Sequence, residues 1–183
     1  MSIEPPLPPE CEAVLVPAAD IARRVNELGV ELCERYQGED LRLITVLRGS
    51  VFFLADLCRA VDAQLKLDFL AVAPYSPGVG GGVRMTKDLD DDIAGARVIL
   101  VEDVVDTGLT INYVLRFLRS HGAASVDVCT LFDKPARRIA EVPIALTGFE
   151  MSDAFLVGYG LDLGGRYRNL PYVASLHEDA VFG

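Results

Sequence analysis

Cysteine pairs, long apolar runs and an excess of basic residues are all missing from this chain. Its four cysteines lie far apart and form no Cys-x-x-Cys pair, which argues against a zinc knuckle and against a disulfide framework. No apolar run approaches the ~18 residues that a membrane helix needs, and the N-terminus lacks the basic start and apolar core of a signal peptide. We therefore expect a cytoplasmic protein without membrane association, whose thiols are reduced and at least partly buried.

The charge balance is acidic. The chain has 17 basic and 27 acidic residues, a formal net charge of −10, which argues against a general nucleic-acid surface. An acidic protein that binds a polyphosphate needs local devices, such as free backbone amides, a metal ion and a few placed basic side chains. The length of 183 residues and the apolar content of 51% fit one globular domain.

Apolar spacing and glycine or proline stops predict an alternation of strands and helices. Helices are expected from about Ala18 to Tyr36, through residues 51–57, and from about Leu109 to Ser120. Strands are expected at residues 41–47, 66–75, 97–103 and 126–132, with short candidates at 154–159 and 172–176. This order predicts an α/β protein with an open, mainly parallel twisted sheet flanked by helices.

Ligands of such sheets lie beyond the carboxyl ends of the strands. The turns expected at that edge comprise residues 48–50, 102–110, 133–134 and 158–162, and they carry the most unusual chemistry in the chain. We therefore expect these four turns to form one site.

The segment that follows the strand at 97–103 carries three carboxylates within five residues, Glu102, Asp103 and Asp106. At the end of a buried strand they repel one another and lose hydration, a cost that a metal ion or a ligand rich in hydroxyls would offset. Asp106-Thr-Gly-Leu-Thr110 comes next, at the start of a helix, where free amides and the helix dipole suit a phosphate. The alternative is an ordinary helix start with Asp106 or Thr107 as N-cap.

Four apolar residues, Glu102-Asp103, two apolar residues and Asp-Thr-Gly-x-Thr together resemble the phosphoribosyl pyrophosphate (PRPP) signature of the type I phosphoribosyltransferases. The resemblance implies that Glu102 and Asp103 hold the ribose hydroxyls, directly or through Mg²⁺, and that Asp106 is the general base at purine N7. It further implies a 5-phosphate cradle made by Asp106, Thr107, Gly108, Leu109 and Thr110.

Further segments resemble the hypoxanthine-guanine branch of this family. Arg48-Gly49 matches its pyrophosphate loop, in which the peptide before the basic residue is often cis; the alternative is a simple strand-to-helix turn. Lys134, in Asp-Lys-Pro, matches the purine-recognition lysine. An ammonium group only donates hydrogen bonds, so it suits the O6 acceptor of a 6-oxopurine and opposes the amino group of adenine. The alternative for Lys134 is a solvated charge in a turn.

Residues 155–168 resemble the base-stacking and second-metal segment of the same branch. The resemblance implies that Phe155 stacks on the purine and that backbone groups at Leu156 and Asp162 read purine position 2. Asp162 would also bind Mg²⁺, and Arg168 would contact pyrophosphate. The alternatives are a core phenylalanine, a turn aspartate and a surface arginine.

The glycine-rich segment 76–83 is predicted to be either a surface loop or a lid with glycine hinges. The branch usually presents a Ser-Tyr pair there, whereas this chain has Pro74-Tyr75-Ser76, and the proline donates no amide hydrogen. We take Tyr75 and Ser76 as the lid residues.

The resemblance also implies a division of the chain. Residues 1–10 would be a flexible leader and residues 11–183 one domain, with a core at roughly 18–143 and a small C-terminal hood at roughly 144–183 that includes part of the N-terminus. The expected substrates are PRPP and a 6-oxopurine, hypoxanthine or guanine, and the expected assembly is a homo-oligomer, a dimer or a tetramer. Alternatives are a xanthine-preferring transferase and a PRPP-sensing regulator that binds nucleic acid, although the latter requires a basic face.

Overall fold

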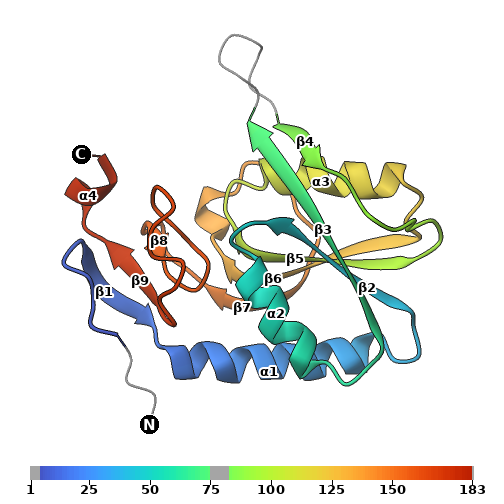
Figure 1. Cartoon of the computed structure of the whole chain (residues 1–183), viewed down its shortest axis with the longest axis horizontal. Helices are drawn as coiled ribbons and strands as arrows, with labels where there is room; N and C mark the ends of the chain where they lie inside the picture. The colour runs from blue at the N-terminus through green and yellow to red at the C-terminus, as the bar shows by residue number, and fades with distance from the viewer. Residues whose placement is uncertain (1–4, 75–82, 183) are drawn as a thin grey trace.

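The computed structural model describes residues 5–74 and 83–182, and a six-stranded sheet forms their centre (Figure 1). The strand order is β4-β3-β2-β5-β6-β7, with parallel pairing throughout except between β3 and β4. The strands are β2 (Leu41–Leu47), β3 (Leu65–Pro74), β4 (Val83–Lys87), β5 (Arg97–Val105), β6 (Ser125–Asp133) and β7 (Ile144–Glu150). The expected open, mainly parallel α/β sheet is confirmed.

Helices cover both faces of this sheet. Helices α1 (Ala18–Arg35) and α2 (Val51–Ala60) lie on one side, and α3 (Leu109–Ser120) lies on the other (Figure 1). Successive residues of β5 alternate between the two cores: Ile99 packs with α1 and α2, whereas Val98 and Leu100 pack with α3. A strand that is buried on both faces reads as a continuous apolar run, which is why residues 97–101 were recognisable in the sequence.

A second, three-stranded antiparallel sheet of order β1-β9-β8 joins the two ends of the chain. It contains β1 (Cys11–Val16), β8 (Leu156–Val157) and β9 (Val173–Leu176), and the short helix α4 (Glu178–Phe182) follows it. We call this sheet, with the loops between β8 and β9 and helix α4, the hood. The large sheet extends to Glu150 at the end of β7, beyond the division at residue 143 that the sequence suggested.

The sequence did not predict β1, β4 or β7. In β1 only the first and last residues are buried, and every residue of β7 except the exposed last one is partly buried, so neither shows a clear period of two. The pattern of β4 does alternate, but only over five residues directly after the glycine-rich segment. Tyr75 and Ser76, the expected lid residues, lie outside the described residues.

All four cysteines are free: Cys11 and Cys129 are buried, and Cys33 and Cys58 are partly buried, as expected. Burial raises the pKa of the Cys129 thiol to about 12. Among the described residues, no helix has both the length and the apolar character needed to cross a membrane.

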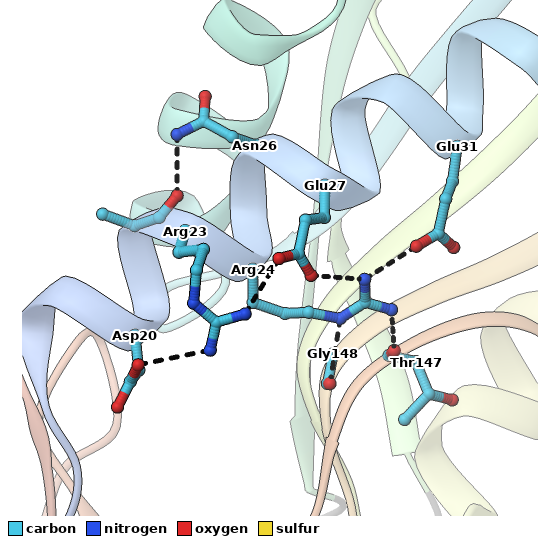
Figure 2. Close-up of polar contacts among 9 residues, drawn as sticks. Asp20, Arg23, Arg24, Asn26, Glu27, Glu31, Thr147 and Gly148 are labelled. Atoms are coloured by element: carbon cyan, nitrogen blue, oxygen red, sulfur yellow. Dashed lines mark hydrogen bonds and ion pairs between the residues drawn. The ribbon is translucent and has the colours of Figure 1, made fainter.

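Arg24 connects α1 to β7 at the edge of the large sheet. Its Nε donates to the Gly148 carbonyl at 3.1 Å and its Nη2 to the Thr147 carbonyl at 2.7 Å, while Nη1 donates to Glu27 and Glu31 (Figure 2). The side chain is 19% exposed. The guanidinium therefore holds β7 against the helix as well as balancing two acids.

Replacing Arg24 with methionine is expected to destabilise the protein, because two carbonyl acceptors lose their donors. We expect a loss of about 1–3 kcal/mol in the free energy of unfolding, measured by urea denaturation. Arg23→Met is the matched control: Arg23 is 60% exposed and, within the described residues, pairs with Asp20 and Glu27 of the same helix, so its replacement should lower the stability much less than that of Arg24. Equal losses in the two variants would contradict a specific role for Arg24 at β7.

Candidate active site

A cavity of about 860 Å³ lies between the carboxyl ends of β2, β5 and β6 and the hood. Most residues that the sequence singled out line it: Arg48, Gly49, Glu102, Asp103, Asp106, Thr107, Gly108, Thr110, Lys134, Phe155, Leu156, Asp162 and Arg168. Leu109 does not line it, and its side chain is 53% exposed. The structure thus brings the four expected turns to one place, as the rule for open α/β sheets predicts.

Glu102 and Asp103 are buried together at the end of β5, at 7% and 9% exposure. The Ser50 hydroxyl lies between them, 3.1 Å from Glu102 Oε2 and 3.2 Å from Asp103 Oδ1. Burial raises the pKa of both carboxyls, and the charge of Asp103 raises the pKa of Glu102 further. Without a ligand, holding both groups charged is unfavourable.

One oxygen of this pair has no protein partner. Glu102 Oε1 is buried and makes no hydrogen bond within the described chain. A buried acceptor without a donor costs free energy, and a hard cation or a hydroxyl group would relieve that cost. Among residues 5–74 and 83–182, no cluster of three or more His, Cys, Asp or Glu side chains is arranged to hold a metal ion by itself.

The start of α3 presents unpaired backbone amides to the cavity. Gly108, with φ of +81°, is the N-cap residue and has no side chain to cap the helix, and the Thr107 hydroxyl accepts one long hydrogen bond, of 3.5 Å, from the Leu109 amide. The alternative in which Asp106 or Thr107 serves as N-cap is therefore wrong. In the described part of the chain, the amides of Thr110 and Ile111 have no acceptor, and both residues line the cavity. Such a helix end favours an anion.

The loop 107–108 is held from the opposite side by a second loop. The Thr107 carbonyl accepts hydrogen bonds from the Ile139 and Ala140 amides at 2.9 and 3.0 Å. A Cβ atom on Gly108 would lie 2.5 Å from the Ala140 carbonyl oxygen, so a side chain cannot be accommodated there without rearrangement. The backbone at the start of α3 is thus fixed by contacts on its outer side.

The loop after β2 approaches both the acid pair and the hood. The Leu47–Arg48 peptide is cis, as in the loops that it resembles. A Cβ atom on Gly49 would lie 2.0 Å from Asp103 Oδ2, and one on Gly160 would lie 2.3 Å from the Gly49 carbonyl oxygen. Two glycines therefore allow the backbone of this loop to lie directly between the acid pair and the hood.

Arg168 and Asp162 form an ion pair at the hood side of the cavity. Arg168 Nη2 lies 2.6 Å from Asp162 Oδ1, and Nη1 donates to the Gly160 carbonyl. Asp162 Oδ2 accepts a hydrogen bond from the Gly165 amide at 2.7 Å. Both side chains are partly buried, so their positions are constrained on several sides.

Lys134 is buried at 7% exposure, which excludes the solvated turn lysine that was the alternative. Its Nζ donates to the Ala154 carbonyl at 2.6 Å, and burial lowers its pKa. Phe155, directly after Ala154, lines the cavity with a ring that is partly exposed, so it is not a core residue. A donor and an aromatic face therefore lie next to each other.

Sequence reasoning missed four polar residues of the cavity, Glu12, Arg137, Asp153 and Glu178. It placed Ser50 in the expected turn 48–50 but gave its side chain no role. Arg137 lies one turn after Lys134, in the 3-10 helix η1 (Pro135–Arg137), and it pairs with both Asp106 and Asp153. Nothing in the local sequence distinguishes Asp153 from a surface aspartate.

Comparisons with known proteins agree with this geometry. Residues 15–163 match the family model described as "Phosphoribosyl transferase domain". The chain is 43% identical over 167 residues to the hypoxanthine phosphoribosyltransferase of Escherichia coli, covering 89% of this chain and 94% of that protein. It is 46% identical over 177 residues to the hypoxanthine-guanine phosphoribosyltransferase of Mycobacterium avium, covering 92% and 87%. A crystal structure of a hypoxanthine phosphoribosyltransferase from Staphylococcus aureus superposes with a TM-score of 0.88 at 37% identity, covering 93% of this chain and 94% of that one.

Proposed function

Because the chain belongs to the phosphoribosyl transferase family, we propose that it is a hypoxanthine-guanine phosphoribosyltransferase of purine salvage. It transfers the 5-phosphoribosyl group of PRPP to N9 of hypoxanthine or guanine, with IMP or GMP and pyrophosphate as products. The observation that carries this assignment is the convergence in one cavity of an uncapped helix start, a buried acid pair and a buried lysine beside Phe155.

The proposed reaction breaks the bond between ribose C1 and the pyrophosphate oxygen and forms a bond from C1 to purine N9. Positive charge develops on the ribose ring as the bond breaks, by analogy with glycosyl transfer. Asp106 accepts the proton that leaves purine N7. The cations of Arg48 and Arg168 stabilise the charge of the departing pyrophosphate. The amides of Thr110 and Ile111 would bind the 5-phosphate.

The acid pair fits a divalent cation, and we propose Mg²⁺. Mg²⁺ prefers oxygen ligands and is commonly held by one or two carboxylates together with substrate phosphates. Glu102, with its unpartnered Oε1, and Asp103 would supply such ligands on the ribose side, and Asp162 would do so on the pyrophosphate side. A bound Mg²⁺ would neutralise part of the negative charge of the pyrophosphate.

Lys134 would determine that the base is a 6-oxopurine. In the free protein its Nζ uses one donor on the Ala154 carbonyl, and an ammonium group has three. A remaining donor suits O6 of hypoxanthine or guanine, whereas the amino group of adenine would leave two donors facing each other. Phe155 would stack on the same base.

Two alternatives from the sequence are still open as proposals. A preference for xanthine depends on purine position 2, which backbone groups near Leu156 and Asp162 would read. A PRPP-sensing regulator is disfavoured by the net charge of −10. The homo-oligomer and the cytoplasmic location are further predictions.

An activity assay with each base separately tests the proposal. With PRPP and Mg²⁺, we expect conversion of hypoxanthine and guanine, followed spectrophotometrically, and a kcat/KM for adenine at least about 100-fold lower. A chelator should abolish turnover, and added Mg²⁺ should restore it. Faster conversion of xanthine than of either base would favour the xanthine alternative. If PRPP binds in calorimetry but no base reacts, the catalytic assignment is wrong.

A further inference from the structure

Arg137 lies between two carboxylates from different parts of the site. Its Nε donates to Asp106 Oδ1 at 2.6 Å, and its Nη1 donates to Asp153 Oδ1 at 2.7 Å. Asp106 follows β5, whereas Asp153 lies between β7 and β8. Hydrogen bonds to Asp153 and Asp106 raise the pKa of Arg137, and the bond to Arg137 lowers the pKa of Asp153. One guanidinium thus connects the loop after β5 to the segment between β7 and β8.

The same turn makes a second contact with that segment. Lys134 Nζ donates to the carbonyl of Ala154, the residue after Asp153 and before Phe155. Lys134 and Arg137 are three residues apart, one turn of η1. Arg137 and Lys134 therefore hold Asp153 and Ala154, the two residues that come immediately before Phe155. The positions of Asp106 and of Phe155 consequently depend on the same turn.

The contact with Asp106 involves only one carboxylate oxygen. Arginine often binds a carboxylate with two parallel bonds, but here Nη1 is engaged by Asp153 and only Nε contacts Asp106 Oδ1. Within the described chain, Asp106 Oδ2 has no hydrogen-bond donor, and Asp106 lines the cavity. This arrangement holds one carboxylate oxygen and leaves the other available to a ligand.

We propose that Arg137 is a positioning residue for Asp106, which it holds by Oδ1 so that Oδ2 accepts the purine proton. The proposal rests on the proposed function. Asp153 binds the other end of the guanidinium, so that the Asp106 carboxylate keeps a constant distance from the segment that carries Phe155. Arg137 itself does not touch the reacting atoms.

Two other cations lie near Asp106, but neither contacts its carboxylate. Lys134 Nζ donates to the Ala154 carbonyl, and Arg138 Nε donates to the Asp106 backbone carbonyl at 3.1 Å while its Nη2 pairs with Asp133. Among the described residues, Arg137 alone contacts the Asp106 carboxylate. Removing Arg137 therefore leaves this carboxylate without the hydrogen bond that orients it, and we expect the loss in kcat rather than in the KM for PRPP.

Steady-state kinetics of Arg137 variants test the proposal in the full-length protein. With hypoxanthine, PRPP and Mg²⁺, we expect Arg137→Met to lower kcat about 10- to 100-fold and to leave the KM for PRPP nearly unchanged. Arg137→Lys keeps the cation, so part of kcat should return. Asp153→Asn keeps the Arg137–Asp106 contact, so kcat should change little, and the KM for hypoxanthine should rise.

Arg116→Met, on an exposed position of α3, is the matched control and should behave as the wild type in every respect. An Arg137→Met enzyme with the wild-type kcat, or one whose loss lies in the KM for PRPP rather than in kcat, would overturn the proposal. So would a loss of rate in Arg137→Lys as large as in Arg137→Met with the same loss of thermal stability, because this indicates a purely structural role. A wild-type protein inactive toward every base would instead reject the proposed function, and this inference with it.

Discussion

Replacing Asp106 with asparagine is expected to lower the kcat for hypoxanthine by about 10²–10⁴-fold. Asparagine has nearly the same shape, and its carbonyl oxygen can still accept the hydrogen bond that Arg137 Nε donates to Asp106 Oδ1. It cannot accept the proton that leaves purine N7. The binding of PRPP should change little, because asparagine keeps the backbone and nearly the same shape at this position of the expected 5-phosphate cradle, so the loss should appear in kcat rather than in the KM for PRPP.

The reverse reaction provides a consistency check on the same effect. The equilibrium constant does not depend on the enzyme, so the kcat/KM of Asp106→Asn for IMP with pyrophosphate must fall when its forward kcat/KM falls. Product release can limit kcat in enzymes of this kind, and single-turnover rates avoid that ambiguity. Asp62→Asn, at an exposed position after α2, is the control. A single-turnover rate of Asp106→Asn within about threefold of the wild type, far inside the range expected for a lost general base, would contradict the assignment.

The central sheet was predictable because its strands are buried on both faces and are therefore continuous apolar runs. Both β2 and α3 have the limits expected from the sequence, and α1 differs only at its last residue. The hood was predictable only in part. The short strands expected at 154–159 and 172–176 contain β8 and β9, whereas β1, which pairs with β9 from the other end of the chain, was not predicted.

In the site, the turns that meet and most of the lining residues were predictable, whereas the partner that each side chain contacts was not. Residues 102–110 form one uninterrupted pattern. Ser50, in contrast, meets Glu102 across 52 positions, and Arg137 meets Asp106 across 31. Which residues become such partners depends on how the loops pack. Composition and spacing carry no information about that packing. The same limit explains why the sequence suggested Asp106 or Thr107 as N-cap, whereas the contacts of the 139–140 loop leave Gly108 in that place.

Gly49→Ala is expected to lower the kcat/KM for PRPP by about 100-fold. The φ angle of Gly49 lies outside the left-handed region, so alanine meets no backbone penalty there. Its new methyl group, however, would lie 2.0 Å from Asp103 Oδ2, 3.1 Å from the Gly160 carbonyl oxygen and 3.2 Å from Arg168 Nη1. Asp103 must move away, which displaces one proposed ligand of the ribose and metal. A displacement of about 1 Å at such a position can reduce the rate 100-fold.

Gly164→Ala separates this effect from the general cost of replacing a glycine. A Cβ atom on Gly164 would meet nothing within 4 Å, but its φ of +60° is unfavourable for alanine. The control should therefore lose about 1–2 kcal/mol of stability and keep the wild-type kcat/KM, unlike Gly49→Ala. Steady-state kinetics against PRPP and urea denaturation of both variants measure the two quantities. If Gly49→Ala kept full activity, Asp103 could leave its position without effect on PRPP, and its proposed role would be wrong.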